Sequence, residues 1–208
     1  MKTLPYEKTV LPKDELISRL LAERPLPLQC EKSVLDALEY NTDNWVRTWI
    51  DTAHTIEHRS GRIKASRAIT QSGRLIWMIQ MHGNRFAFHA DRDPVEDAFR
   101  QASEARRARK AIAARWPEIV KLRRRILIGT EGLTVSIDDA RHAGLCELGI
   151  QGFLHRVGLG GRTHFPGRVL AVLSFMDRQV GYAIFAGHLR QRAERSGSNL
   201  MWAVPDEH

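Results

Sequence analysis

The sequence predicts an α+β fold, in which an N-terminal antiparallel β-meander of three to four strands is backed by a helix and followed by an all-helical C-terminal domain. Three observations support this prediction. Turn signals recur near residues 60, 72 and 83, an even spacing that is typical of consecutive hairpins. The two later turns select the same apolar face of the strands between them. Apolar residues at helical spacing follow from residue 94 onward.

The segment 63–90 is the most strongly patterned part of the predicted meander. A two-residue turn at 83–84 and a three-residue turn at 71–73 both place glycine where a positive φ is needed. These turns predict the pairs Met81 with Phe86, Ile79 with Phe88, Ile69 with Leu75, Ala65 with Ile79 and Ile63 with Met81. Since side chains alternate along a strand, all of these residues point to one face.

Residues 45–58 are compatible with a helix or a strand. Trp45, Trp49, Ala53 and Ile56 follow helical spacing. The threonine and β-branched content, together with the turn signal at 60–61, favours a strand over Thr52–His58. In that strand a tight turn at 60–61 pairs His58 with Ile63, Glu57 with Lys64 and Ile56 with Ala65.

Two short helices are expected before the sheet. Residues 1–27 predict a leader with one helix over 15–23, capped by Asp14 and ended by the prolines that follow. Its apolar edge consists of Leu16, Leu20 and Leu21. A second short helix is predicted over 33–40.

The longer helices follow the sheet. Asp91 or Asp93 is expected to cap a helix that begins at Pro94, with Arg100 and Glu104 as an i,i+4 ion pair. Further helices are predicted over 118–128, 146–157, 168–176 and 178–192, the last two as core helices. Ser136 with Asp139 resembles a capping box, and Asp177 is the expected cap between the last two helices. The implied domains are 28–116 and 117–195, with a tail over 196–208.

The net positive charge of the chain is concentrated in one segment, and this indicates the kind of partner to expect. The 208-residue chain has a net charge of +8, and residues 98–127 hold ten Lys/Arg against two Glu, so the remaining residues sum to zero. Such a basic block favours anionic partners. The first residues lack the apolar run of a secretory signal, and no apolar run approaches a membrane span. A reduced, cytoplasmic protein is the expectation.

No motif in the sequence names an enzyme, and no metal or cofactor is expected. His54-Thr-Ile-Glu57-His58 matches the H-x-x-E-H pattern of inverted zinc peptidases, but the match requires a helix; in a strand Glu57 points away from the two histidines. The glycine-rich segment 158–162 lacks a preceding strand and a G-K-[ST] ending, so an interhelical loop is the better interpretation. Cys146 is interpreted as a small core residue.

The basic block and the second face of the sheet are the candidate binding surfaces. Basic helices can bind phosphates, while Arg and Gln on a sheet face can contact base edges. The candidate nucleic-acid-binding residues are Arg106, Arg107, Arg109, Lys110, Lys121, Arg123, Arg124, Arg125, Lys64, Arg74, Gln80, His82 and Arg85. His89, Ser66 and Met78 belong to the same predicted sheet face.

Residues 62–112 carry the pattern W-x-I-x-x-x-G-x-x-F, formed by Trp77, Ile79, Gly83 and Phe86, followed by a helix start at 94–99. This order of a three-stranded sheet and an Ala-rich helix resembles the AP2-type DNA-binding domains of phage integrases and plant regulators. The usual glycine before the helix is replaced by an acidic segment over 90–93. The resemblance implies a sheet that lies in a DNA groove.

The sequence therefore favours a non-enzymatic nucleic-acid-binding protein, with DNA as the expected ligand. The alternative is a protein-protein adaptor or assembly subunit whose basic helices meet an acidic partner protein.

Overall fold

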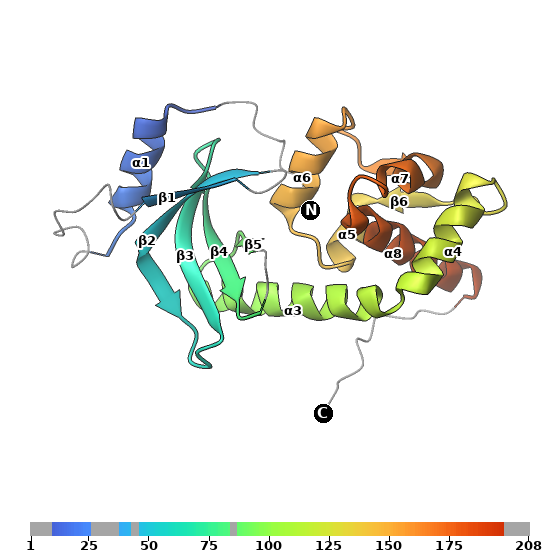
Figure 1. Cartoon of the computed structure of the whole chain (residues 1–208), viewed down its shortest axis with the longest axis horizontal. Helices are drawn as coiled ribbons and strands as arrows, with labels where there is room; N and C mark the ends of the chain where they lie inside the picture. Colours follow the sequence, from blue (N-terminus) through green and yellow to red (C-terminus); the bar gives the residue numbers. More distant parts are fainter. Residues whose placement is uncertain (1–9, 26–37, 43–45, 84–86, 198–208) are drawn as a thin grey trace. The chain divides into compact units, whose positions relative to one another are not determined.

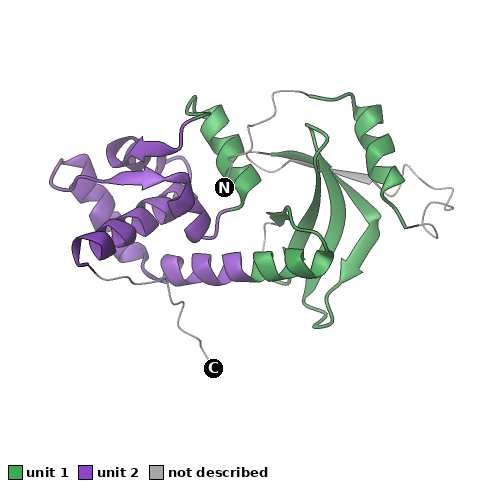
Figure 2. Ribbon diagram, turned by 180° about the vertical axis from the view of Figure 1, so that it is seen from behind, with its two compact units in different colours: residues 1–103, 146–161 green, residues 104–145, 162–208 purple. Residues whose placement is uncertain are grey.

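A computed structural model describes residues 10–25, 38–42, 46–83 and 87–197 (Figure 1). The chain divides into two compact units, which are described one at a time (Figure 2). Unit 1 comprises residues 1–103 and 146–161, and unit 2 comprises residues 104–145 and 162–208. The division falls within helix α3 (Val95–Ala114), whose first part belongs to unit 1 and whose second part belongs to unit 2.

Unit 1 is built on an antiparallel meander, which confirms the predicted α+β class. The strands follow one another in chain order as β1 (Leu38–Thr42), β2 (Arg47–Glu57), β3 (Ile63–Thr70), β4 (Leu75–Met81) and β5 (Phe88–Ala90). The register also agrees: Ile69 pairs with Leu75, Ala65 and Phe88 with Ile79, and Ile63 with Met81. The predicted partner Phe86 lies outside the described residues.

Strand β2 shows that residues 47–57 form a strand and not a helix. Ile56 pairs with Ala65 and Glu57 with Lys64, while the His58 N–H donates to the Ile63 carbonyl at 2.9 Å. Gly61 closes this turn with a φ of +67°, a conformation that glycine adopts without strain. A bulge between Asp51 and Thr55 shifts the register once along the strand.

Helices cover both faces of this sheet. On the first face, Leu16 and Leu20 of α1 (Lys13–Ala22) pack with Ile69 and are fully buried. The imidazole of His58 stacks edge-on against Phe99 near the start of α3, at 5.0 Å between ring centres. On the second face, α6 (Glu147–Arg156) packs against the sheet through Leu148. The unit is thus a sheet between two helical layers.

Two predictions about the short helices are wrong in detail. Residues 38–40 belong to β1, which pairs with the edge of β2, because strand pairing overrides a weak local helix preference; residues 33–37 lie outside the described part of the chain. Helix α1 begins at Lys13 behind Pro12, so Asp14 lies within its first turn and does not cap it.

Unit 2 is largely helical. After the second part of α3 it contains α4 (Trp116–Leu127), α5 (Ile137–His142), α7 (Gly167–Leu173) and α8 (Arg178–Arg195). Ile119, Leu122 and Ile126 form the buried side of α4, as their spacing predicts. The expectation of helices alone is corrected by a two-stranded sheet of β6 (Thr134–Ser136) and β7 (His164–Pro166). Strands of three residues are too short for an alternating pattern to reveal them.

Two predicted caps in unit 2 are confirmed. Ser136 accepts from the Asp139 N–H at 3.1 Å, and Asp139 accepts from the Ser136 N–H at 2.7 Å, which completes the capping box. Asp177 accepts from the Gln179 N–H at 2.8 Å at the start of α8. Asp139 has a second role, because its buried carboxylate binds Arg190 of α8 at 2.8 and 3.0 Å. This pair joins α5 to α8.

Candidate nucleic-acid interface

The predicted base-reading face of the sheet is not a continuous polar surface. Its centre consists of Ala68, Ile76 and Met78, which are buried, and the partly buried Leu148 of α6 packs against them. His89 is also buried on this side. The strand pattern could not reveal this, because Leu148 of the covering helix lies 70 residues after Met78 in the chain.

The polar residues at the ends of this face are partly engaged. The Lys64 ammonium lies 2.7 Å from a Glu57 carboxylate oxygen, and the Arg74 guanidinium lies 3.0 Å from Asp91. Gln80 and His82 are exposed, whereas Arg85 lies outside the described residues. Each ion pair lowers the local positive charge of this face.

The first basic segment lies on α3. Arg106, Arg107 and Lys110 are exposed along this helix, and Arg109 is half-buried with its Nε 3.4 Å from the Ala105 carbonyl. The predicted pair between Arg100 and Glu104 is not the one that forms, because Arg100 donates to Asp97 at 2.8 Å. An i,i+3 acid on the preceding turn is equally close on a helix surface.

The second basic segment is the solvent side of α4. Lys121 and Arg124 are exposed, opposite the buried side of the helix. Arg125 donates to Glu131, which shares its carboxylate with His188. Arg123 differs from the other three, because its guanidinium lies 4.1 Å from the centre of the Phe175 ring.

Helix α8 contributes basic residues that the sequence did not single out. Arg192 and Arg195 are exposed in its last turns. A hydrogen bond from Arg115 lowers the pKa of Glu118, and the charges of Lys121 and Arg192 lower it further. These two cations therefore approach the same carboxylate from α4 and from α8.

Cations of α4 and α8 also act together on Glu131 and His188. A hydrogen bond from Arg125 lowers the pKa of Glu131, and the positive charge of Arg195 acts in the same direction. Burial lowers the pKa of His188 most, Glu131 opposes this shift, and Arg125, Arg192 and Arg195 add to it.

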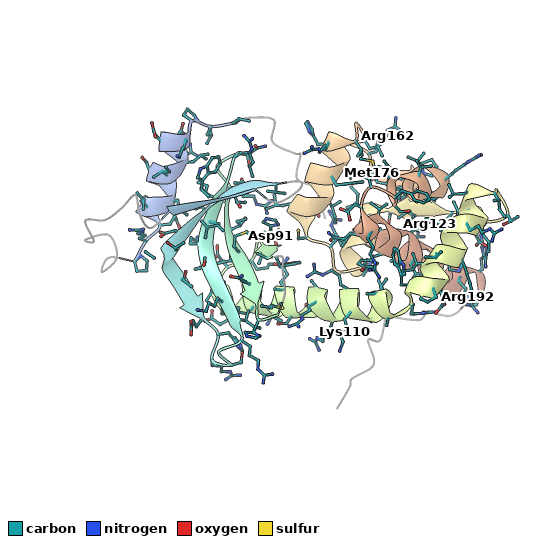
Figure 3. All side chains as sticks on the ribbon, in the orientation of Figure 1. Asp91, Lys110, Arg123, Arg162, Met176 and Arg192 are labelled. Atoms are coloured by element: carbon teal, nitrogen blue, oxygen red, sulfur yellow. The ribbon has the colours of Figure 1, made fainter. Side chains whose placement is uncertain are left out.

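The residues on these two helices form one cluster, named here the α4–α8 basic surface. Its members are Lys121, Arg125, His188, Arg192 and Arg195, which act on shared groups, together with the exposed Arg124, which precedes Arg125 on α4. Arg192 is labelled in Figure 3, beside α4. Among the described residues, Lys121, Arg124, Arg192 and Arg195 have no carboxylate within ion-pair distance. They are therefore available to an external anion.

Net charge differs sharply between the two units. Unit 2 contains 16 Lys/Arg and 9 Asp/Glu, which makes +7, whereas unit 1 contains 16 and 15, which makes +1. Because a local excess of one sign attracts counter-charged ligands, the expected anion-binding part of the chain is the helical unit.

The strand conformation of β2 directs Glu57 away from the two histidines of the peptidase-like motif. His54 stacks edge-on against Trp77 with its ring centre at 5.4 Å, and His58 stacks against Phe99 on the same side of the sheet. Glu57 is exposed and pairs with Lys64. In the described part of the chain no group of three or more His, Cys, Asp or Glu side chains is arranged to hold a metal ion.

Cys146 lies at the N-cap of α6, where the sequence suggested a residue of an apolar helical face. Its Sγ is 3.5 Å from Nδ1 of His89, a neighbour that is 57 residues away in sequence. Burial raises the pKa of the Cys146 thiol, but the hydrogen bond with His89, its charge and the Gly149 backbone outweigh burial and lower the pKa overall.

Comparison with family models, with curated proteins and with solved structures found no match. Within the described residues, no helix combines the length and the hydropathy that crossing a membrane requires.

Proposed function

We propose that the protein binds nucleic acid, with DNA as the first ligand to test, through the α4–α8 basic surface of unit 2. The observation that carries this proposal is the convergence of Lys121 and Arg125 of α4 with Arg192 and Arg195 of α8, in a unit that holds +7 of the +8 net charge. Phosphates bound by such residues release condensed counterions, which supplies most of the free energy of non-specific binding.

The two helices have different roles in this proposal. The α4 residues contact the phosphate backbone, and the end of α8 extends the contact to further phosphates. Helix α3 adds Arg106, Arg107 and Lys110 within the same chain. The sheet residues Gln80 and His82 are secondary, because the neighbouring Lys64 and Arg74 are already paired with carboxylates. Binding is accordingly expected to depend weakly on base sequence.

The test is fluorescence anisotropy with a labelled random-sequence duplex and with a single strand, at several salt concentrations. The variant Lys121→Ala/Arg124→Ala removes two exposed cations that have no carboxylate partner among the described residues. The control Arg59→Ala/Arg62→Ala removes the same charge from exposed positions in unit 1.

The proposal expects affinity to fall steeply with salt, and the α4 variant to reduce the slope of log K against log salt by about 1 to 2. The unit 1 control should keep the wild-type slope. Absence of binding at low salt, or equal losses in both variants, contradicts the proposal.

A further inference from the structure

Unit 2 has an exposed apolar surface that its own core does not use. Six of the eight large apolar side chains that are exposed in the described residues belong to this unit. Four of them lie on α7 and the turn that follows it, and are named here the α7 apolar stripe: Val169 (40% exposed), Val172 (56%), Phe175 (66%) and Met176 (65%). The sequence pattern had assigned α7 to the core on most sides, which is wrong for this face.

The stripe follows from the geometry of α7. Val169 and Val172 are spaced i and i+3, which places them on one side of α7, and Phe175 and Met176 follow in the turn after the helix. The opposite side holds Gly167, Leu170 and Ala171, which are buried. The unit therefore packs one side of α7 and presents the other to solvent, and a group of adjacent exposed apolar side chains is typical of an interaction surface.

Cations border this stripe. Arg123 of α4 lies over the Phe175 ring, with its guanidinium carbon 4.1 Å from the ring centre. Arg168 is exposed four residues before Val172 on the same side of α7. A guanidinium that lies over an aromatic ring can still donate the N–H groups in its own plane to a carboxylate. Arg123 and Met176 are labelled in Figure 3.

Acidic residues are scarce around the stripe. The segment 162–176 contains none, and the next residue, Asp177, is the N-cap of α8. A second copy of the chain would bring a stripe bordered by the same cations, Arg123 and Arg168, and like charges across an interface oppose association. Charge complementarity instead favours a partner that has an apolar side with acidic margins.

We infer that the α7 apolar stripe docks an amphipathic helix of a partner protein, with apolar residues against Val172 and Phe175 and with acidic residues opposite Arg123 and Arg168. The apolar contacts supply affinity, and the flanking charges fix which partner binds and in which orientation. This surface is distinct from the α4–α8 basic surface, so the inference does not depend on nucleic-acid binding.

The experiment titrates the full chain, labelled with ¹⁵N, with three synthetic helical peptides. The first has leucines along one side and glutamates at the margins, the second has lysines in place of the glutamates, and the third has the composition of the first in scrambled order. Chemical shifts locate each contact. Because Val172 and Met176 are exposed, Val172→Ser/Met176→Ser leaves the core intact, and Ile56→Ser in unit 1 is the matched control.

The inference predicts that only the glutamate peptide binds, with shifts at α7, and that Val172→Ser/Met176→Ser weakens this binding about tenfold or more. The Ile56→Ser control should bind as the wild type does. Arg168→Glu should weaken the glutamate peptide and strengthen the lysine peptide.

Four results would overturn the inference. They are the absence of binding by any peptide, equal binding of the glutamate and lysine peptides, a concentration-dependent dimer that the Val172→Ser/Met176→Ser variant abolishes, and α7 shifts with phosphatidylserine vesicles but with no peptide. The third result would assign the stripe to a second copy of the chain, and the fourth to an anionic membrane surface.

Discussion

Replacing Arg24 should destabilise unit 1 strongly, although this residue lies beyond the end of a short N-terminal helix. Its Nε and Nη2 donate to the two carboxylate oxygens of Asp51 at 2.6 and 2.8 Å. The two side chains are 1% and 0% exposed, so water cannot replace either partner. Asp51 also accepts from the Ala53 N–H at 3.0 Å and thereby supports the bulge in β2.

Arg24→Met keeps the length of the side chain and leaves the Asp51 carboxylate buried without this counter-charge. Breaking a buried ion pair in this way costs about 3–5 kcal/mol, whereas an exposed pair contributes about 1 kcal/mol or less. The double variant Arg24→Met/Asp51→Asn removes both charges and keeps an acceptor for Ala53. It should therefore recover part of the loss, with a coupling energy of about 1–3 kcal/mol.

Native-state hydrogen exchange at the β3 amides measures the opening free energy of unit 1 alone. The complete cycle of wild type, two single variants and double variant gives the coupling energy. A loss of about 1 kcal/mol or less in Arg24→Met would refute the reasoning, since the pair would then behave as an exposed one.

Three further perturbations test other parts of the structure. Burial lowers the pKa of His54, so folding favours the neutral imidazole. The free energy of unfolding should therefore keep its full His54 contribution above pH 6.5 and decrease as the pH falls below 6.5. Urea titrations at several pH values should show a flatter pH dependence for His54→Asn. Gly73→Ala should lower the free energy of unfolding more than Gly61→Ala does, as measured by thermal unfolding. Gly73 has a φ of +84°, and a Cβ at this position would lie 2.7 Å from the Leu11 side chain. At Gly61 a Cβ meets no neighbour, so only about 1–2 kcal/mol of backbone strain is added. Asp139→Ala removes both the cap of α5 and the ion pair with Arg190, and should lower the free energy of unfolding of unit 2 by about 2–4 kcal/mol. Asp138→Ala removes only an i,i+3 pair with Arg141 and should lower it by about 0.5 kcal/mol. Hydrogen exchange at the α5 and α8 amides measures both losses.

Local pattern was enough to predict the meander and its register. The turns at 60–61 and 71–73 restrict the pairing to a few choices, and alternation selects one because a shift of one residue would expose the apolar side chains. The Ser136 capping box and the Asp177 cap were predictable for the same reason, since each involves residues within one turn of the chain.

Contacts between distant segments could not be predicted from one sequence. Arg24 and Asp51 are 27 residues apart, and nothing local marks either as buried. Met78 on the second sheet face is covered by Leu148, which turned a predicted polar surface into an apolar one at its centre. The basic block at α4 was evident from composition, but its extension by Arg192 depends on the packing of α8 against α4.

The most direct test of the account is an ¹⁵N–¹H titration of the full chain with a random-sequence duplex, read residue by residue. The account predicts shifts at α4 and at the last turns of α8, centred on Lys121, Arg124 and Arg192, with little change in β3 and β4. Shifts centred on the sheet residues Gln80 and His82, or no shifts at low salt, would contradict it.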